Sequence, residues 1–349
     1  MLRNDVFVGG RDGYHTYRIP ALVIANDGAL LAFCEGRRHG PADDGKIDLL
    51  LKRGSDNGRS WSAQTVVCAE EGDRPVTMGN PCPVAERATG CIHLLFTRNN
   101  KRLFHTRSND GGLTWSPPRD FTNILDGFDY PRVRIATGPV HGIQTRRGRL
   151  VVPVWISDRE IKEMNEEPTP TRFQSGTIHS DDHGATWAAG GLVPPAVSRL
   201  NECTVVERTD GSLLLNMRAH GAGFRAVATS ADGGASWSEP ALNRDLPCPT
   251  CQASIIRGPG GNLLFLNPAA TVPGSESHGP RHKLTLRSSP DEGRTWSTVC
   301  VVNEGPSGYS DLAVAEDGSV LCLFENGPTR YNEKISILAV QKEILRADH

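Results

Sequence analysis

The chain has 349 residues, of which 38% are hydrophobic and 22% charged, and its formal net charge is −2. This composition is typical of a globular protein with a sizeable core, and the balanced charge argues against nucleic acid or an acidic membrane as a partner. No apolar run approaches the roughly 20 residues of a membrane-spanning helix. The first residues, MLRNDVFVGGRDG, lack the apolar segment of a signal peptide. We therefore expect a cytoplasmic protein, unless a leader has been removed, with no obligate protein partner.

Short apolar runs follow one another along the whole chain, separated by glycine and proline. They begin with ALVIA and ALLAF, continue through DLLLK, CIHLLF, RLVVPVW, CTVVE, SLLLNM, NLLFL and KLTLR, and end with SVLCLF and ISILAV. Runs of about 4–8 residues rich in Val, Ile, Leu and Phe are typical of β-strands. The nearest helical candidate, Asp158–Glu167, is short, polar and followed by Pro168, so we interpret it as a loop or a surface turn of helix. The fold is predicted to be all-β.

A second pattern, Ser-x-Asp-x-Gly-x-Thr/Ser-Trp, recurs between these runs, roughly every 50–70 residues. Such a repeat in a strand-rich chain predicts propeller blades of four strands each. We interpret these Asp boxes as structural, because an Asp accepts hydrogen bonds from turn amides, Gly supplies a positive φ and Trp anchors the turn. One carboxylate per copy is too few to hold calcium. The boxes are Gly54–Trp61 (with Gly in place of the opening Ser), Ser108–Trp115, Ser180–Trp187, Ser230–Trp237 and Ser289–Trp296.

The boxes also predict the number of blades. Five boxes account for five blades, and the strand-like runs before the first box and after the last suffice for one more. A ring closed by strands from both ends of the chain has no open sheet edge. We therefore predict a six-bladed β-propeller, with residues 1–349 forming one catalytic domain.

The nine cysteines are an odd number, and several lie inside apolar runs. This placement predicts reduced, buried thiols rather than a disulfide framework. Cys248-Pro-Thr-Cys251 is a lone CxxC motif, which is weak evidence for zinc without a second cysteine or histidine pair. We expect no metal and no other cofactor. The cysteines in apolar runs include Cys34, Cys91, Cys203 and Cys322.

The segment Tyr17-Arg18-Ile19-Pro20, standing ahead of several Asp boxes, resembles the exo-α-sialidases (neuraminidases) of bacteria and animals. The resemblance extends over essentially the whole chain, and the stretch from Tyr17 to Trp61 looks like the opening of both bacterial and mammalian cytosolic members. It implies a glycoside hydrolase that removes terminal α-linked sialic acids from glycoproteins, gangliosides and oligosaccharides. It also implies a retaining mechanism that uses a tyrosine nucleophile, an exception among glycosidases.

The resemblance implies three arginines that hold the substrate carboxylate by charge-assisted hydrogen bonds. Arg18 and Arg218 match the first two. Arg281 matches the third because it precedes a strand, and Arg287 is its alternative. Arg37 is implied to contact the sugar. Taken singly, arginines at such places are more typical of surface salt bridges, and the neighbouring Glu35 has no assigned role.

The resemblance also implies the catalytic groups. Tyr309 matches the nucleophile and Glu202 the base that activates it, which a phenol of pKa near 10 requires. Asp43 matches the acid/base, with Asp44 as the neighbour that competes for this role. Close to the substrate, a carboxylic acid needs a raised pKa to donate a proton, so we expect one for Asp43 beside bound substrate. Glu325 is implied to orient the first arginine.

Other functions remain as alternatives. A non-catalytic Asp-box propeller would have no reason to keep these arginines, carboxylates and tyrosine together. An intramolecular trans-sialidase, or a hydrolase of deaminated sialic acid, would use the same fold, but the sequence shows no acceptor site that excludes water. Hydrolysis is therefore the default expectation. Linkage preference is expected to depend on two loops, Asp158–Phe173 and Ala269–Gly279.

Overall fold

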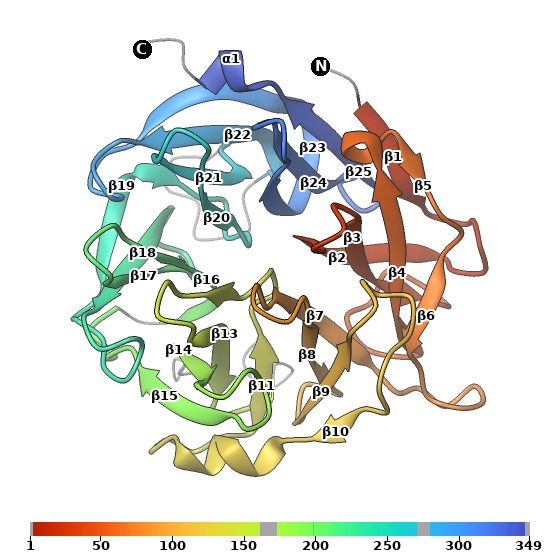
Figure 1. Cartoon of the computed structure of the whole chain (residues 1–349), viewed down its shortest axis with the longest axis horizontal. Helices are drawn as coiled ribbons and strands as arrows, with labels where there is room; N and C mark the ends of the chain where they lie inside the picture. Colours follow the sequence, from red (N-terminus) through yellow and green to blue (C-terminus); the bar gives the residue numbers. More distant parts are fainter. Residues whose placement is uncertain (1–2, 161–172, 198, 271–279, 346–349) are drawn as a thin grey trace.

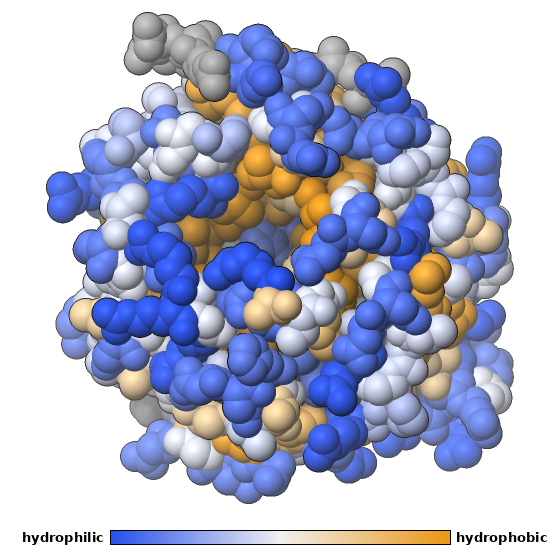
Figure 2. Space-filling model, viewed as in Figure 1, coloured by the Kyte–Doolittle hydropathy of each residue, from blue (hydrophilic) through white to orange (hydrophobic). Residues whose placement is uncertain are grey.

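The structure is a computed structural model that describes residues 3–160, 173–197, 199–270 and 280–345. The strands of these residues form five hydrogen-bonded sheets, arranged as a ring around a common centre in the order of the chain (Figure 1). The centre of the ring is hollowed on the face seen in Figure 2. Within the described residues, no helix has the length and apolar character needed to cross a membrane. The prediction of an all-β chain is confirmed, and its arrangement is propeller-like.

Four of the sheets each occupy one sector of the ring (Figure 1). The first contains β2 (Thr16–Ile24), β3 (Leu30–Arg37), β4 (Ile47–Ser55), β5 (Ser60–Trp61) and β6 (Thr65–Cys68). The second contains β7 (Met78–Ala85), β8 (Ile92–Arg98), β9 (Arg102–Ser108) and β10 (Arg119–Asp120). The third contains β11 (Arg134–Thr137), β12 (Ile143–Gln144), β13 (Leu150–Ser157), β14 (Phe173–Ser180) and β15 (Ala188–Leu192). The fourth contains β16 (Leu200–Glu207), β17 (Leu213–Ala219), β18 (Phe224–Ser230) and β19 (Ala241–Pro247).

The fifth sheet is larger and closes the ring. Its seven strands are ordered β1-β25-β24-β23-β22-β21-β20. The strand β23 has 18 residues; its first part pairs with β22, and the part from Ser307 onward pairs with β24. The six predicted blades therefore do not appear as six separate sheets. The strands are β1 (Arg3–Val8), β20 (Ser254–Arg257), β21 (Leu263–Pro268), β22 (His282–Ser289), β23 (Ser297–Val314), β24 (Val320–Asn326) and β25 (Lys334–Val340).

The two ends of the described chain lie side by side (Figure 1). The N-terminal β1 pairs antiparallel with β25, so that Arg3 faces Leu338. This pairing confirms that strands from both ends complete the last sheet, although β1 is the only N-terminal strand in it. The short elements are the 3-10 turns η1 (Asp56–Gly58) and η2 (Thr122–Gly127) and the helical turn α1 (Lys342–Leu345).

The core consists of apolar side chains between neighbouring sheets. Between the first two sheets, for example, Leu31 and Phe33 of β3 share a buried cluster with Leu94 and Phe96 of β8. Because most middle strands are covered on both faces, their sequences are continuous apolar runs rather than alternating patterns. This explains why runs such as ALLAF and SLLLNM show so little polar alternation.

The Asp boxes form the turns between the outer strands of the sheets. In the third sheet, Ser180 Oγ donates to Asp182 Oδ1 at 2.8 Å, and the amide of Gly184 donates to Ser180 Oγ at 2.9 Å. The Thr186 hydroxyl closes the turn by donating to Asp182 Oδ2 at 2.6 Å. Equivalent contacts recur in three other boxes, around Asp110, Asp232 and Asp291. These bonds support the structural interpretation of the motif.

The box glycines also let each turn pack tightly against the preceding sheet. Gly184 has a φ of 76°, and a Cβ there would lie 2.2 Å from the ring of His93 in the second sheet. The first box differs because Gly54 offers no hydroxyl. Among the described hydrogen bonds, the Asp56 side chain makes none with its own turn, and only Asn57 links this turn to Asp317. The box without the opening serine also differs in backbone, since Asp56 has a φ of 50°.

All nine cysteines are free and most are buried, as predicted. Burial raises the pKa of several of these thiols, including that of Cys251 to about 11. In the CxxC segment, the Cys251 amide donates to Cys248 Sγ at 3.4 Å. Within the described residues, no group of three or more His, Cys, Asp or Glu is placed to hold a metal ion.

Candidate active site

Three of the predicted site residues, Arg18, Glu202 and Tyr309, lie at β-bulges of different sheets. The pairing register shifts just after Arg18 in β2, around Glu202 in β16, and around Tyr309 in β23. A bulge adds a residue on one strand and re-aims its side chain. Three segments that are far apart in the sequence therefore present these side chains to one place.

Ile19 marks the bulge in β2. Its φ is 59°, which is unusual for a β-branched residue and is strained. The amide of Ile19 donates to Glu325 Oε1 at 2.8 Å, and its side chain packs in a small buried cluster with Cys251 and Tyr309. The next residue, Pro20, has no N–H to leave unpaired at the bulge. The Arg-Ile-Pro segment is thus a local backbone device that turns Arg18 toward the site.

Glu325, near the end of β24, connects the Arg-Ile-Pro segment to Tyr309, the candidate nucleophile. Arg18 Nε donates to Glu325 Oε1 at 2.6 Å, and both side chains are buried. The other carboxylate oxygen of Glu325 accepts a hydrogen bond from the Tyr309 amide at 3.0 Å. One carboxylate therefore fixes Arg18, Ile19 and Tyr309 relative to each other, as expected for a residue that orients the first arginine.

Tyr309, Glu202 and Arg218 form a buried hydrogen-bonded group. The Tyr309 hydroxyl donates to Glu202 Oε1. Arg218 Nη1 donates to Glu202 Oε2 at 2.5 Å and to the Tyr309 hydroxyl oxygen at 3.1 Å. Burial, and then the negative charge of Glu202, raise the pKa of Tyr309 well above its usual value. The phenol is therefore neutral and already bonded to a group that can accept its proton.

The third predicted arginine also lies at Tyr309. The Arg281 guanidinium carbon is 5.5 Å from the centre of the Tyr309 ring, and Arg281 donates to the carbonyl of Thr250 at 3.1 Å. Within the described part of the chain, no carboxylate lies within ion-pair distance of Arg281. Its positive charge is thus available to an anion.

Arg287, the alternative for the third arginine, lies inside its sheet. It is buried and donates to Asn267 Oδ1 at 2.9 Å. Burial lowers its pKa to about 10. This placement favours Arg281 as the residue that faces the site.

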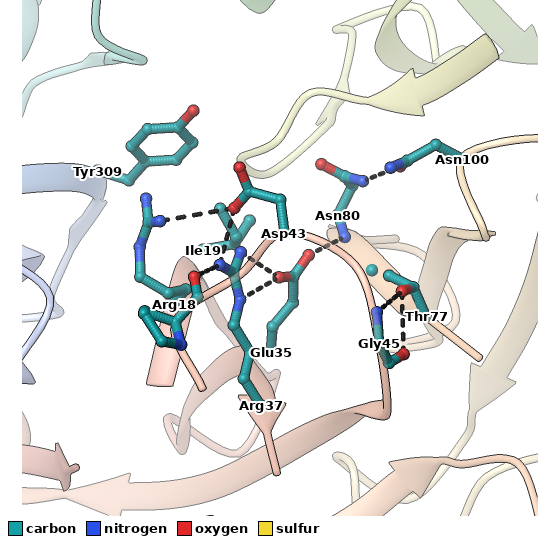
Figure 3. Close-up of polar contacts among 12 residues, drawn as sticks. Arg18, Ile19, Glu35, Arg37, Asp43, Gly45, Thr77, Asn80, Asn100 and Tyr309 are labelled. Carbon is teal, nitrogen blue, oxygen red and sulfur yellow. Dashed lines mark hydrogen bonds and ion pairs between the residues drawn. The ribbon is translucent and has the colours of Figure 1, made fainter. Parts of the chain in front are cut away.

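Asp43 lies on the loop between β3 and β4, above two arginines (Figure 3). Asp43 Oδ1 is 2.7 Å from Arg37 Nη1 and 3.7 Å from Arg18 Nη1, while the side chain is 82% exposed. Partial desolvation alone would raise the pKa of Asp43, but the charges of Arg37 and Arg18 outweigh it and hold that pKa below its usual value. In the free protein Asp43 therefore favours its carboxylate form. Among the described ion pairs, Asp44 has none with these arginines.

Arg37 is held by Glu35, which had no assigned role. Glu35 Oε2 accepts from Arg37 Nε at 3.1 Å and from Arg37 Nη2 at 2.8 Å, and Glu35 Oε1 accepts from the Asn80 amide at 2.9 Å (Figure 3). Burial raises the pKa of Glu35. Glu35 thus orients the guanidinium that pairs with Asp43, and it connects the first sheet to the bulge at Asn80 in β7.

The structure adds two residues that the sequence did not indicate. The guanidinium carbons of Arg18 and Arg281 lie 5.2 and 5.1 Å from the centre of the Tyr331 ring, a cation–π arrangement. Arg225 is fully buried and donates to the Cys251 carbonyl at 2.7 Å and to the Glu202 carbonyl at 3.4 Å. No sequence motif marks either residue, because both act through contacts with distant segments.

Most of the two loops expected to govern linkage preference, residues 161–172 and 271–279, lies outside the described residues, as does most of the helical candidate Asp158–Glu167.

Comparison with known proteins identifies the class. Residues 28–322 match the family model described as a BNR repeat-like domain. The chain is 36% identical over 352 residues to a sialidase of Micromonospora viridifaciens, a match that covers 93% of this chain and 52% of the relative. It is 33% identical over 396 residues to Sialidase-3 of Homo sapiens, covering 95% of this chain and 90% of the relative. It thus spans about half the length of the bacterial relative and most of the human one.

Solved structures of sialidases superpose on this chain. The Hadza microbial sialidase Hz136 superposes with a TM-score of 0.83 at 28% identity, covering 98% of this chain and 69% of that one. Trypanosoma rangeli sialidase superposes with a TM-score of 0.80 at 20% identity, covering 99% of this chain and 60% of that one, which shows likeness of fold. The chain belongs to the sialidase family.

Proposed function

We propose that this protein is a retaining exo-α-sialidase that hydrolyses terminal α-linked sialic acids of glycoproteins, gangliosides and oligosaccharides. The observation that carries this proposal is the Tyr309 hydroxyl donating to Glu202 beside three arginines. A sialic acid bears a carboxylate on its anomeric carbon. Arg18, Arg218 and Arg281 would bind that carboxylate and place the anomeric carbon near the phenol oxygen.

A neutral nucleophile suits such a substrate. An ionised carboxylate would be repelled by the substrate's carboxylate, whereas the Tyr309 phenol develops negative charge only as its oxygen bonds to the anomeric carbon. Glu202 takes the phenol proton in this step, and Asp43 gives a proton to the departing glycosidic oxygen. In the second step Asp43 takes a proton from water, whose oxygen displaces the phenol, and Glu202 returns the proton to Tyr309. Two inversions give net retention.

Substrate binding would bring Asp43 into its acid form. In the free protein, Arg37 and Arg18 favour the carboxylate and lower its pKa. A substrate carboxylate on Arg18 would offset part of that positive charge and exclude water from Asp43. Both effects raise the pKa of an acid. The acid would thus be protonated mainly in the complex that needs it.

The ring is best counted as six blades in one catalytic domain, residues 1–349. Counting β23 twice divides the seven-stranded sheet into two blades of four strands, β20-β21-β22-β23 and β23-β24-β25-β1. Six clusters of buried apolar residues between adjacent blades support this count.

The test is hydrolysis of a fluorogenic aryl α-sialoside, with proton NMR of the first product released. The proposal expects the α-anomer of free sialic acid before mutarotation. Initial release of the β-anomer would contradict retention, and an anhydro sugar would indicate intramolecular transfer instead of hydrolysis. Parallel assays with N-acetylated and deaminated substrates define which sugar is preferred.

A further inference from the structure

The loop that carries Asp43 joins β3 to β4 and is exposed at its tip. The side chains of both His39 and Asp43 are more than half exposed. The base of the loop is closed by a backbone hydrogen bond from the Arg38 amide to the Lys46 carbonyl at 3.1 Å. The position of Asp43 therefore depends on its own contact with Arg37, 2.7 Å from Oδ1 to Nη1, and on what holds the two ends of the loop.

Both ends meet at one buried carboxylate, Asp48, the second residue of β4. Asp48 Oδ2 accepts from Arg38 Nε at 3.0 Å and from Arg38 Nη2 at 2.8 Å. Lys46 Nζ lies 3.7 Å from Asp48 Oδ1. Arg38 begins the loop and Lys46 ends it, so a single negative charge links the two stems electrostatically.

The surroundings of Asp48 make this linkage strong. The Asp48 side chain is completely buried, and its Oδ2 also accepts from the Tyr14 hydroxyl at 2.8 Å. The Arg38 guanidinium carbon lies 4.5 Å from the centre of the Tyr14 ring. Charge-assisted and bidentate contacts are the strongest hydrogen bonds in proteins, and removing one partner of a buried pair leaves the other charge uncompensated.

Thr77, the residue just before β7, also supports the loop. Thr77 Oγ1 accepts from the Gly45 amide at 3.2 Å and donates to the Gly45 carbonyl at 3.1 Å (Figure 3). Gly45 has a φ of 125°, a conformation that glycine adopts readily. The C-terminal stem of the loop is thus held by both Asp48 and Thr77, whereas the N-terminal stem is held by Asp48 and by the Arg37 Nη1 hydrogen bond to the Pro41 carbonyl at 2.5 Å.

We propose that Asp48 is a positioning residue for the acid/base: through Arg38 and Lys46 it holds the loop that places Asp43 over the glycosidic oxygen. This proposal rests on the proposed sialidase function. It predicts a defect of a particular kind, because misplacing a general acid harms substrates whose leaving group needs a proton and largely spares those whose leaving group does not.

The experiment compares Asp48→Asn with the unaltered protein on two substrates. One is an aryl α-sialoside with an acidic phenol as leaving group, and the other is sialyllactose, whose alcohol leaves poorly. We expect Asp48→Asn to lower kcat/KM on sialyllactose by about 10- to 100-fold more than on the aryl sialoside, a part of the ~10²–10⁴-fold that general acid catalysis supplies. Arg38→Gln, which removes the same link from the loop side, should act in the same direction.

Two controls match these changes. Asp311→Asn also neutralises a buried carboxylate of an ion pair, with His141 at 2.7 Å, away from the loop; it should leave the ratio of the two substrates unchanged. Tyr14→Phe removes a neutral hydrogen bond from Asp48 but neither ion contact, and should change the ratio less than about threefold. An equal loss on both substrates in Asp48→Asn and Arg38→Gln would overturn the proposal.

A readout without substrate separates this proposal from the proposed function. Hydrogen–deuterium exchange of the peptide covering Arg38–Lys46 should be faster in Asp48→Asn than in the unaltered protein, with the exchange of β16 and β23 unchanged. Unchanged exchange in the loop would contradict the positioning role. If the unaltered protein hydrolyses neither sialoside, the proposed function fails, while this exchange measurement still decides what Asp48 does.

Discussion

The Tyr309 hydroxyl and the Glu202 carboxylate, 107 residues apart in the sequence, are joined directly by a buried hydrogen bond. The bond forms because a bulge in β16 and a bulge in β23 turn the two side chains toward each other. Arg218 contacts both, so the phenol, its proton acceptor and a cation share one position. A tyrosine that only fills the core needs neither contact, so this arrangement supports the proposed role of Tyr309 as nucleophile.

Replacing Tyr309 by Phe should abolish most turnover while leaving binding of sialic acid largely intact, because Arg18, Arg218 and Arg281 remain. Calorimetric titration with free sialic acid measures the binding. In the unaltered protein, a fluorinated sialosyl fluoride should trap a covalent adduct on Tyr309 that peptide mass spectrometry locates. An adduct on Glu202 or Asp43 would refute the assigned nucleophile.

Arg281→Ala should impair catalysis, whereas Arg287→Ala should mainly impair stability. Loss of Arg281 would remove the proposed buried contact to the substrate carboxylate and should cost about 2–5 kcal/mol in binding of substrate and transition state, or roughly 30-fold to several thousand-fold in kcat/KM. Arg287 instead bonds to Asn267 within its sheet, so its loss should lower the melting temperature and change KM little. Equal kinetic losses in the two variants would show that the third arginine is misassigned.

Arg37→Met should shift the pH dependence of kcat/KM. Desolvation raises the pKa of Asp43, and the Arg37 and Arg18 charges lower it below its usual value. Without the Arg37 cation the pKa of Asp43 rises, so Asp43 keeps its proton to higher pH. The basic limb of the profile should therefore move to higher pH. Arg53→Met, which removes a cation paired with Asp27 outside the site, should leave the limb in place; an unmoved limb in Arg37→Met would count against Asp43 as the acid.

The Asp boxes should contribute to stability and not to catalysis. Hydrogen bonds to Thr186 and Ser180 lower the pKa of Asp182 to about 2, so its contribution is present above the unfolded-state pKa and is lost as the pH falls toward 2. Asp182→Asn should lower the free energy of unfolding by about 1–3 kcal/mol at neutral pH, with KM unchanged.

Asp56→Asn is the matched control for that prediction. The first box lacks the opening serine, and among the described hydrogen bonds the Asp56 side chain makes none with its turn. The melting temperature should therefore change little, and the difference between the two variants should shrink as the pH approaches 2. An equally large loss in Asp56→Asn would mean that the charge alone, and not the organised turn, stabilises the boxes.

The all-β fold and the box turns were predictable because their causes are local. Four of the five boxes place a serine, an aspartate, a glycine and a threonine or serine within eight residues, so one short motif specifies the turn. The continuity of β23 was not predictable in the same way. Gly305, Pro306 and Gly308 are typical of a break between strands, yet the chain passes through a bulge there and continues into the next pairing.

The residues of the site could be predicted from the sequence, but the contacts that hold them in place could not. Arg18, Glu202 and Tyr309 follow from the resemblance to sialidases, whereas their bulges depend on pairing with other strands. Arg225 and Tyr331 carry no motif because they act across the fold. The lowered pKa of Asp43 depends on the two arginines beneath its loop. No sequence pattern encodes the distance between the loop and these arginines.

The pairing of β1 with β25 has a consequence for how the protein is made. Arg3 of β1 leaves the ribosome 335 residues before Leu338, its partner in β25. At roughly 5–20 residues per second, β1 spends on the order of tens of seconds with an unpaired edge. During that time it is open to pairing with another nascent chain. Such pairing is discouraged by the charged residues Arg3 and Asp5 and by the bulge between Asp5 and Phe7. The strand that completes the ring is thus protected against pairing with another chain before its own partner is made.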